Sequence, residues 1–251
     1  MAGTPPWDAV DLAPGVLAAF TTRAGGVSRA PWDSLDLGLG VGDDEADVLA
    51  NRARLAAWVG APVAFGTQVH GAGVLVVHGA PADERTVGVA DAYLATGADV
   101  AVGVLVADCV PVLLADPEAR VVAAVHAGRG GLVAGVLGAA VAAMTRHGAT
   151  PGRIRAAVGP SVAGASYEVP AAMRDEVGLR LPEAPTTTSW GTPALDLRAA
   201  AVGELARVGV HHVVRVERDT FVDPALFSHR RATAAGTTTG RACGVVRLLP
   251  G

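Results

Sequence analysis

The sequence predicts a single mixed α/β domain over residues 1–251. Of the 251 residues, 51% are apolar and only 18% are charged, which supports a large buried core and excludes a disordered polyelectrolyte. Several short Val-rich segments are apolar throughout, as is typical of strands covered on both faces. Helical segments interrupt these strands without the regular alternation of a TIM barrel or a Rossmann fold, so we expect one mixed architecture.

Taken in order, the first 40 residues show little periodicity, and Thr21–Ser28 indicates a strand end followed by a Gly-Gly turn. A helix is expected over 43–59, capped by Asp43 or Asp44 and ended by Gly60-Ala61-Pro62. Strands are expected at 63–69, 74–77, 91–96, 100–106, 112–114, 121–125, 154–158, 213–216 and 244–249. Further helices are expected at 132–147, 171–177 and 195–208, and surface loops at 180–193 and 232–240.

Composition also limits the partners. A net charge of -4 argues against a nucleic-acid or membrane-surface binder. All 20 positive side chains are Arg, which excludes a Schiff-base or Walker lysine.

The start MAGTPPWDAV lacks a signal-peptide pattern, and the longest uncharged run, 130–145, is shorter than the roughly 18 residues of a membrane span. We therefore expect a cytoplasmic monomer in which Cys109 and Cys243 stay unpaired.

Three polar side chains follow predicted strands at the point where each strand ends. Cys109 follows the run VAVGVLVA, His126 follows VVAAV and precedes a Gly-rich turn into a helix, and His70 ends a short strand. Strand exits of this kind are where α/β proteins place ligand sites. Each residue also has a structural interpretation: a buried thiol, a turn-capping histidine and a surface histidine, respectively.

Together the three residues match a known donor set. Two His and one Cys with a fourth position open form a recognised catalytic zinc site. A nucleophilic Cys/His pair would use the same residues without a metal. Their separations along the chain are long, so no local motif decides between the two.

Short motifs along the chain resemble those of the YfiH-like family, whose members are also called laccase-domain or multicopper polyphenol oxidase-like proteins. They are, in order, TTRAGGVS, QVHG, DAYLAT, ADCVPVLLAD, HAGRGG, GPSVAGASYEV, FSHRR and TGR. The resemblance implies an αββα sandwich related to the catalytic domain of cytotoxic necrotising factor. It also implies a metal, usually zinc, on His70, Cys109 and His126. Activities described for the family are phosphorolysis of purine nucleosides, deamination of adenosine and, in a bacterial branch, editing of peptidoglycan precursors.

The chain departs from the family pattern around this metal set. Arg129-Gly130 stands where the family has Trp-Arg, Asp36 where it has Asn, and His229 where it has Tyr. The Cys-rich segment of the family is here GPSVAGASYEV, without Cys. An Asp in place of Asn removes two hydrogen-bond donors and adds a negative charge, which is unfavourable beside a phosphate.

The interpretation adopted is a zinc-dependent purine nucleoside enzyme, a phosphorylase of adenosine, inosine and methylthioadenosine that also deaminates adenosine. His70, Cys109 and His126 are the candidate catalytic and metal residues. The candidate substrate- and phosphate-binding residues are Arg23, Asp36, Gln68, Arg129 and Arg230. Arg23, beside Gly25-Gly26, is the first candidate for the phosphate and Arg129 the next. Near the metal, either Arg129 holds an anion, or Arg129 points to solvent and Arg23 or Arg230 holds it.

Three other functions remain open. The first is a Cys–His hydrolase that edits peptidoglycan precursors, with Cys109 as nucleophile and His126 as base. The second is a polyphenol oxidase with copper in place of zinc, although three Met, seven His and no HxH cluster fit a multicopper site poorly. The third is a binding protein that has lost catalysis.

Overall fold

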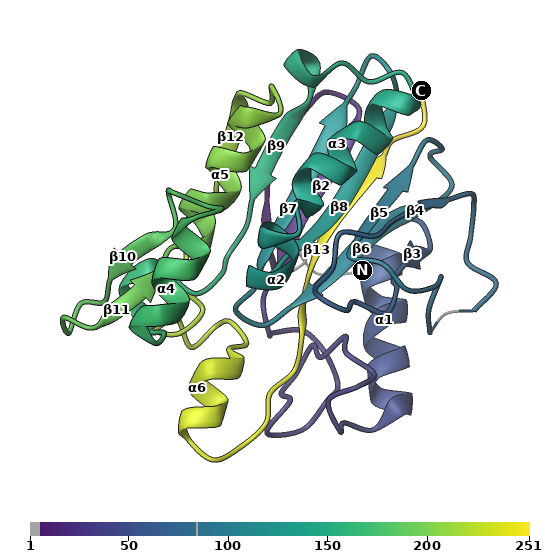
Figure 1. The fold of residues 1–251 in the computed structure, drawn as a ribbon. Helices are drawn as coiled ribbons and strands as arrows, with labels where there is room; N and C mark the ends of the chain where they lie inside the picture. Colours follow the sequence, from purple (N-terminus) through teal and green to yellow (C-terminus); the bar gives the residue numbers. More distant parts are fainter. Residues whose placement is uncertain (1–5, 84) are drawn as a thin grey trace.

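Two β-sheets packed face to face form the centre of the protein (Figure 1). The computed structural model describes residues 6–83 and 85–251; the first half of the segment MAGTPPWDAV lies outside them. The six-stranded sheet has the order β12 (His212–Arg215), β9 (Arg155–Val158), β7 (Val110–Asp116), β8 (Val121–Ala127), β5 (Ala92–Ala95) and β4 (Val74–Val77). The five-stranded sheet has the order β1 (Trp7–Ala9), β2 (Val16–Thr21), β13 (Ala242–Leu248), β6 (Ala101–Val106) and β3 (Val63–Ala64).

Helices cover the outer faces of the two sheets (Figure 1). The six-stranded sheet is covered by α2 (Arg129–Val133), α3 (Val136–Arg146), α4 (Ala171–Gly178) and α5 (Leu197–Arg207), and the five-stranded sheet by α1 (Glu45–Val59). A hairpin of β10 (Pro185–Thr187) and β11 (Pro193–Leu195) lies beside α4, and α6 (His229–Ala234) precedes β13. The expected αββα sandwich is therefore confirmed.

A buried apolar layer fills the space between the sheets. Its largest side chains include Phe20 and Tyr93, which are packed with Leu113, Val122 and Val246 from both sheets. Strands buried on both faces explain why these segments are apolar throughout rather than alternating. In the part of the chain that the structure describes, no helix is long and apolar enough to cross a membrane.

Strand register brings the expected site residues to one edge of the six-stranded sheet. In the antiparallel pair β7–β8, Pro111 lies opposite His126, so Cys109 emerges next to that histidine. On the other side of β8, the His126 N–H donates to the Asp91 carbonyl at 2.7 Å. The ends of three neighbouring strands therefore meet where the sequence places Cys, His and Asp.

The sequence predicts one continuous helix over 132–147, and this prediction is wrong. The helical segment begins earlier, at Arg129, and is interrupted at Gly135, whose φ of 81° lies in the left-handed region and separates α2 from α3. The expected first helix is confirmed: Asp44 accepts hydrogen bonds from the N–H groups of Ala46 and Asp47, and Gly60 ends it with φ 75°.

The expected strand at 63–69 is also wrong, because only Val63–Ala64 belongs to a sheet. A Cβ at Gly66 would lie 2.2 Å from the Tyr93 hydroxyl, so the chain passes close over that ring and leaves the sheet. The expected loop at 180–193 contains β10 and the start of β11, and α6 occupies the start of the expected loop at 232–240.

Candidate metal centre

The centre of the site is a cluster of two histidines and one cysteine. One ligand atom each from His70, Cys109 and His126 lies within 4.8 Å of the others, and the Cys109 Sγ is 3.7 Å from the His70 Nε2. The two imidazole rings meet edge to face, with centroids 4.7 Å apart. The three residues converge as expected, although His70 lies in a loop and not at a strand exit, and this group can bind a metal ion.

Asp91 holds the cluster together. Its Oδ1 accepts from the His126 Nδ1 at 2.8 Å and from the His70 N–H at 2.9 Å. Its Oδ2 accepts from the N–H groups of Val69 and Gly71. Asp91 therefore fixes both the loop that carries His70 and the orientation of the His126 ring, whose Nε2 is left to face the cluster. A carboxylate behind a histidine is the usual support of a metal-binding imidazole.

The backbone is strained at two positions in the site. His70 has φ 59° and Asp108 has φ 86°, values that side chains other than glycine rarely adopt. The Asp108 side chain accepts from the Thr220 hydroxyl at 2.6 Å and from the Arg230 N–H at 2.7 Å. These hydrogen bonds hold the Asp108 turn, and thereby the adjacent Cys109, in place.

The protonation states favour a thiolate. Burial raises the pKa of the Cys109 thiol, but the contacts to His126 and His70 outweigh burial and lower that pKa to about 6. Burial lowers the pKa of His126, but its bonds to Asp91 and Cys109 raise that pKa to about 9. The cysteine is therefore prepared to act as an anionic ligand or a nucleophile.

The donor set and the space around it fit a metal ion. Two imidazoles and a thiolate with a remaining open position are typical of catalytic zinc sites. Gly128 lies directly against the cluster: a Cβ there would lie 2.7 Å from the His70 Cδ2 and 3.0 Å from the Cys109 Sγ. The absence of a side chain at this position allows the ligands to approach one another.

Replacing Gly128 with alanine is expected to weaken metal binding about 10-fold or more, because the new methyl group displaces His70 or Cys109. The backbone of Gly128 (φ -73°) accepts alanine without strain, so the effect is local. Elemental analysis and competition with a chelator measure it. Gly152→Ala is the control, since nothing lies within 4 Å of its Cβ. Equal metal affinity in the two variants would contradict the prediction.

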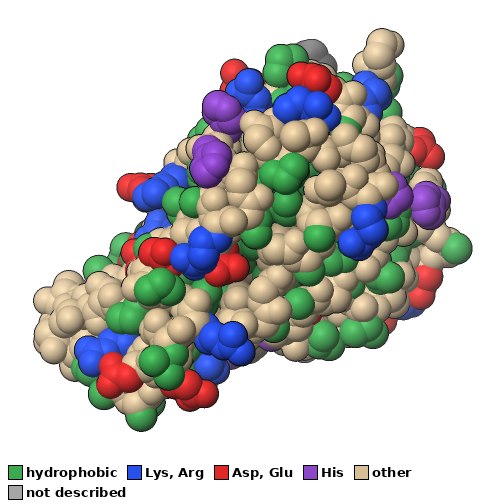
Figure 2. Space-filling model, turned by 45° about the horizontal axis from the view of Figure 1, so that its top comes forward, with side chains coloured by type: hydrophobic (Ala, Val, Ile, Leu, Met, Phe, Trp, Pro, Cys, Tyr) green, Lys and Arg blue, Asp and Glu red, His purple; other side chains and the backbone are tan. Residues whose placement is uncertain are grey.

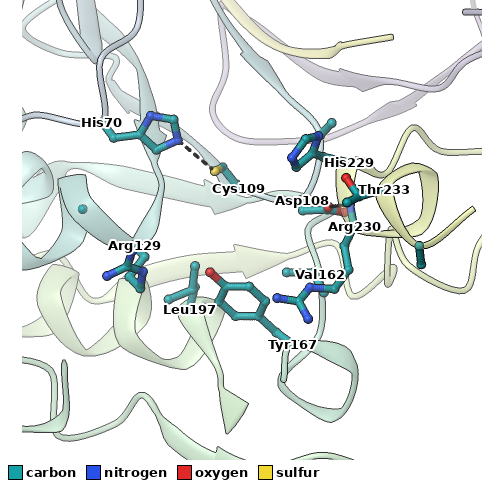
Figure 3. Close-up of a pocket in the computed structure, with 13 residues that line it drawn as sticks. His70, Asp108, Cys109, Arg129, Val162, Tyr167, Leu197, His229, Arg230 and Thr233 are labelled. Carbon is teal, nitrogen blue, oxygen red and sulfur yellow. Dashed lines mark hydrogen bonds between the residues drawn. The ribbon is translucent and has the colours of Figure 1, made fainter. Parts of the chain in front are cut away.

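Two cavities share His70 and Cys109 of the cluster as a common wall, and His126 lines only the smaller of them. The larger, about 670 Å³, has apolar, aromatic and basic groups (Figure 3). Its lining comprises His70, Ala107, Asp108, Cys109, Arg129, Gly130, Val162, Tyr167, Leu197, His229, Arg230, Thr233 and Ala234. The smaller, about 540 Å³, includes Arg52, Arg85 and Arg241. His70, Cys109 and His229 border both cavities.

The structure distributes the expected binding residues differently. Arg129 and Arg230 line the larger cavity, where the Arg230 guanidinium lies 4.7 Å from the Tyr167 ring centroid. Gln68 lines the smaller cavity, but its amide pairs at 2.8 Å with both the N–H and the carbonyl of Leu105. The Gln68 amide therefore attaches the His70 loop to β6.

Arg23 and Asp36 line neither cavity. The Arg23 guanidinium donates to the side chain and the carbonyl of Asp33 and lies over Phe227. Asp36 is fully buried, and its Oδ1 accepts from the N–H groups of Gly38 and Arg241. Asp36 therefore influences the smaller cavity only through Gly38 and Arg241, which line that cavity and whose backbone N–H groups donate to Asp36.

Sequence reasoning missed Asp91, Tyr167 and Arg241 as site residues. Asp91 precedes a buried strand in DAYLAT, and Arg241 ends TGR, so both lie in motifs that point to the site.

Neither cysteine is in a disulfide, as expected. Cys109 is half-buried at the site, and Cys243 is buried in a separate apolar cluster.

The surface does not display one continuous charged patch on the face in Figure 2. Basic side chains there lie among acidic ones. Ion pairs between described residues include those of Arg207 with Glu183 at 2.6 Å and with Glu204 at 2.8 Å. Such mixed charge agrees with the small net charge of the sequence.

Comparison with known proteins agrees with this fold and site. The family model described as multi-copper polyphenol oxidoreductase laccase matches residues 17–249. The chain is 48% identical over 241 residues to a purine nucleoside phosphorylase of Streptomyces coelicolor, covering 95% of this chain and 98% of that one. The structure of YlmD from Geobacillus stearothermophilus matches with a TM-score of 0.88 at 33% identity, covering 100% and 98% of the two chains. YfiH of Bacillus licheniformis matches with a TM-score of 0.86 at 26% identity, covering 98% and 97%. The chain belongs to the YfiH-like family of multi-copper polyphenol oxidoreductase laccase proteins.

Proposed function

We propose that the protein is a zinc-dependent purine nucleoside phosphorylase acting on adenosine, inosine and methylthioadenosine, with adenosine deamination as a second activity. One observation carries the proposal: two cavities of different chemistry meet at the cluster, with His70 and Cys109 in the lining of both and His126 in the lining of the smaller one. Phosphorolysis needs a nucleoside and a phosphate on opposite sides of the reacting sugar carbon. Relatives that share 45–48% of their residues with the chain are named purine nucleoside phosphorylases.

The larger cavity suits the purine. Tyr167, Leu197 and Val162 offer apolar and aromatic surface, and Arg129 and Arg230 can donate to purine or ribose acceptors. The smaller cavity suits the phosphate, because Arg241 borders it with a guanidinium that donates only to the carbonyls of Thr239 and Gly240 among the described residues. The remaining N–H groups of Arg241 are available to an anion.

His70, Cys109 and His126 would hold the zinc ion, which when bound supplies a Lewis acid with an open coordination position. Asp91 keeps His126 in the tautomer that presents Nε2, and Gly128 leaves room for the ligands. Copper is the less suitable metal: among the described residues this is the one group of three or more His, Cys, Asp or Glu ligands, whereas multicopper sites need several.

The test is elemental analysis of the purified protein together with product analysis. With adenosine and phosphate we expect one zinc per chain and release of adenine and ribose 1-phosphate, with inosine as the deamination product. Adenine release that does not require phosphate would contradict phosphorolysis.

We also propose that the protein is a monomer in the cytoplasm. Light scattering tests its oligomeric state, and cell fractionation tests its localisation.

The position of the phosphate gives a separate prediction. Arg241→Gln is expected to weaken phosphate binding about 10–100-fold, because a charge-assisted hydrogen bond contributes on the order of 1.5–3 kcal/mol. Arg129→Ala should leave phosphate affinity nearly unchanged and weaken nucleoside binding instead. Calorimetry at fixed salt measures both variants. Weaker phosphate binding in Arg129→Ala alone would place the anion in the larger cavity, as the sequence predicts, and reverse the substrate orientation.

A Cys–His hydrolase that edits peptidoglycan precursors is the second candidate. It is favoured by the pKa values of two neighbouring side chains: that of Cys109 is lowered to about 6, and that of His126 is raised to about 9. Such a pair resembles an activated thiolate beside its imidazolium. Metal stoichiometry separates the candidates. Amide hydrolysis by metal-free protein would support the hydrolase, and loss of all activity with the metal would exclude it.

A further inference from the structure

Outside the cluster, His229 is the one titratable side chain among the described residues that borders both cavities. It is the first residue of α6, and its side chain is exposed. Figure 3 shows His70 and His229 on opposite sides of Cys109, with His229 beside Thr233 and Arg230. A molecule bound against the cluster in the larger cavity therefore meets the His229 ring.

The backbone under His229 is fixed, while its ring is free. Ser228 caps α6 by accepting from the Arg231 N–H at 3.1 Å, and Asp108 accepts from the Arg230 N–H at 2.7 Å. The Arg231 guanidinium donates to the carbonyls of Phe221 and Asp223, both at 3.1 Å. The His229 ring, in contrast, makes no hydrogen bond to any described residue, so its nitrogens are available to a ligand.

Most of the other proton carriers around the larger cavity are already engaged. Both oxygens of Asp108 accept hydrogen bonds, from Thr220 and from the Arg230 backbone. Tyr167 lies beneath the Arg230 guanidinium, and His70 and Cys109 belong to the candidate metal set. Arginine does not release its proton in proteins. His229 is a histidine of this wall whose ring no described residue engages, and histidine is the side chain that most often serves as a general acid.

We propose that His229 is a further catalytic residue, the general acid that protonates the departing purine. The inference rests on the proposed phosphorolysis. The bond between the sugar C1′ and the purine nitrogen breaks, and its electron pair goes to the purine ring. A phosphate oxygen forms the new bond to C1′. The imidazolium of His229 gives its proton to the purine N7, and the proton of the hydrogen phosphate ion restores the imidazolium, so the products are neutral purine and the ribose 1-phosphate dianion.

The test compares two nucleosides that differ in their need for this proton. Inosine requires protonation of its base, whereas 7-methylinosine carries a methyl group and a positive charge at N7 and leaves without a proton. His229→Gln is expected to lower kcat/KM for inosine about 100-fold, the usual contribution of a general acid, and to change kcat/KM for 7-methylinosine less than about 3-fold. Gln retains a hydrogen-bonding amide but cannot act as an acid.

His212→Gln is the matched control, because His212 is an exposed histidine on β12 that lines neither cavity. Elemental analysis should find the same metal content in both variants and in the wild-type protein. Equal losses on the two nucleosides would show that His229 only binds substrate, and no loss on either would show that it has no part; both results overturn the inference. A wild-type protein that releases no base from either nucleoside would instead contradict the proposed function.

Discussion

Cys109→Ser is expected to reduce bound metal from one ion per chain to nearly none and to lower phosphorolysis at least about 100-fold. The Sγ of Cys109 is the one thiolate in the cluster, and Cys109 lines both cavities. Loss of a residue that merely orients a metal ligand typically costs 10–100-fold in affinity or activity, and removing one of three ligands should cost more. Elemental analysis and product assays on the same preparation measure the two effects.

Asp91→Asn is the companion variant, since Asp91 touches no substrate cavity but supports His126 and the His70 loop. It should lose 10–100-fold in metal affinity and regain activity when excess zinc is added. Cys109→Ser should not be rescued in this way. If Cys109→Ser retained its metal while losing all activity, the cysteine would be a nucleophile, and the hydrolase would become the better proposal.

Cys109 and His126 could be predicted as site residues because each follows an unbroken apolar run, whereas the strand expected before His70 ends at Ala64. Strands buried on both faces leave a local signal, and the polar residue after each marks the edge of the sheet. What brings Cys109 next to His126 is the register of β7 against β8, in which Pro111 pairs with His126. Register depends on packing across the sheet, so the local pattern predicts the candidates, while their convergence is expected from the resemblance to the family.

The residues that sequence reasoning missed act through long-range contacts. Asp91 supports the cluster because residues 69–71, which lie outside the sheet, donate three backbone hydrogen bonds to its carboxylate. Arg241 reaches the smaller cavity because β13 is inserted between β2 and β6. No local periodicity encodes either contact. The break at Gly135 likewise depends on a single left-handed residue within an otherwise helical pattern.

Asp36 shows how a substitution next to the site can alter stability without touching a ligand. Its side chain is fully buried, and its Oδ2 has no hydrogen-bond partner among the described residues. Burial raises the pKa of Asp36 to about 6, against an ordinary value of 3.8, even though two backbone N–H groups favour the charged form. A carboxylate at neutral pH is therefore held in an environment that disfavours its charge.

Asp36→Asn is accordingly expected to become more stable than the wild type as the pH rises. Since the folded pKa lies above the unfolded one, the folded wild type binds more protons between about pH 4 and 6, and its stability falls over that interval. Asparagine keeps an oxygen for the N–H groups of Gly38 and Arg241 and does not ionise. The difference in the free energy of unfolding should therefore grow by on the order of 2–3 kcal/mol between pH 4 and 7. Urea unfolding at several pH values measures it, with the exposed helix cap variant Asp44→Asn as control. A difference that is the same at pH 4 and pH 7 would show that water or the Arg241 guanidinium neutralises the buried charge.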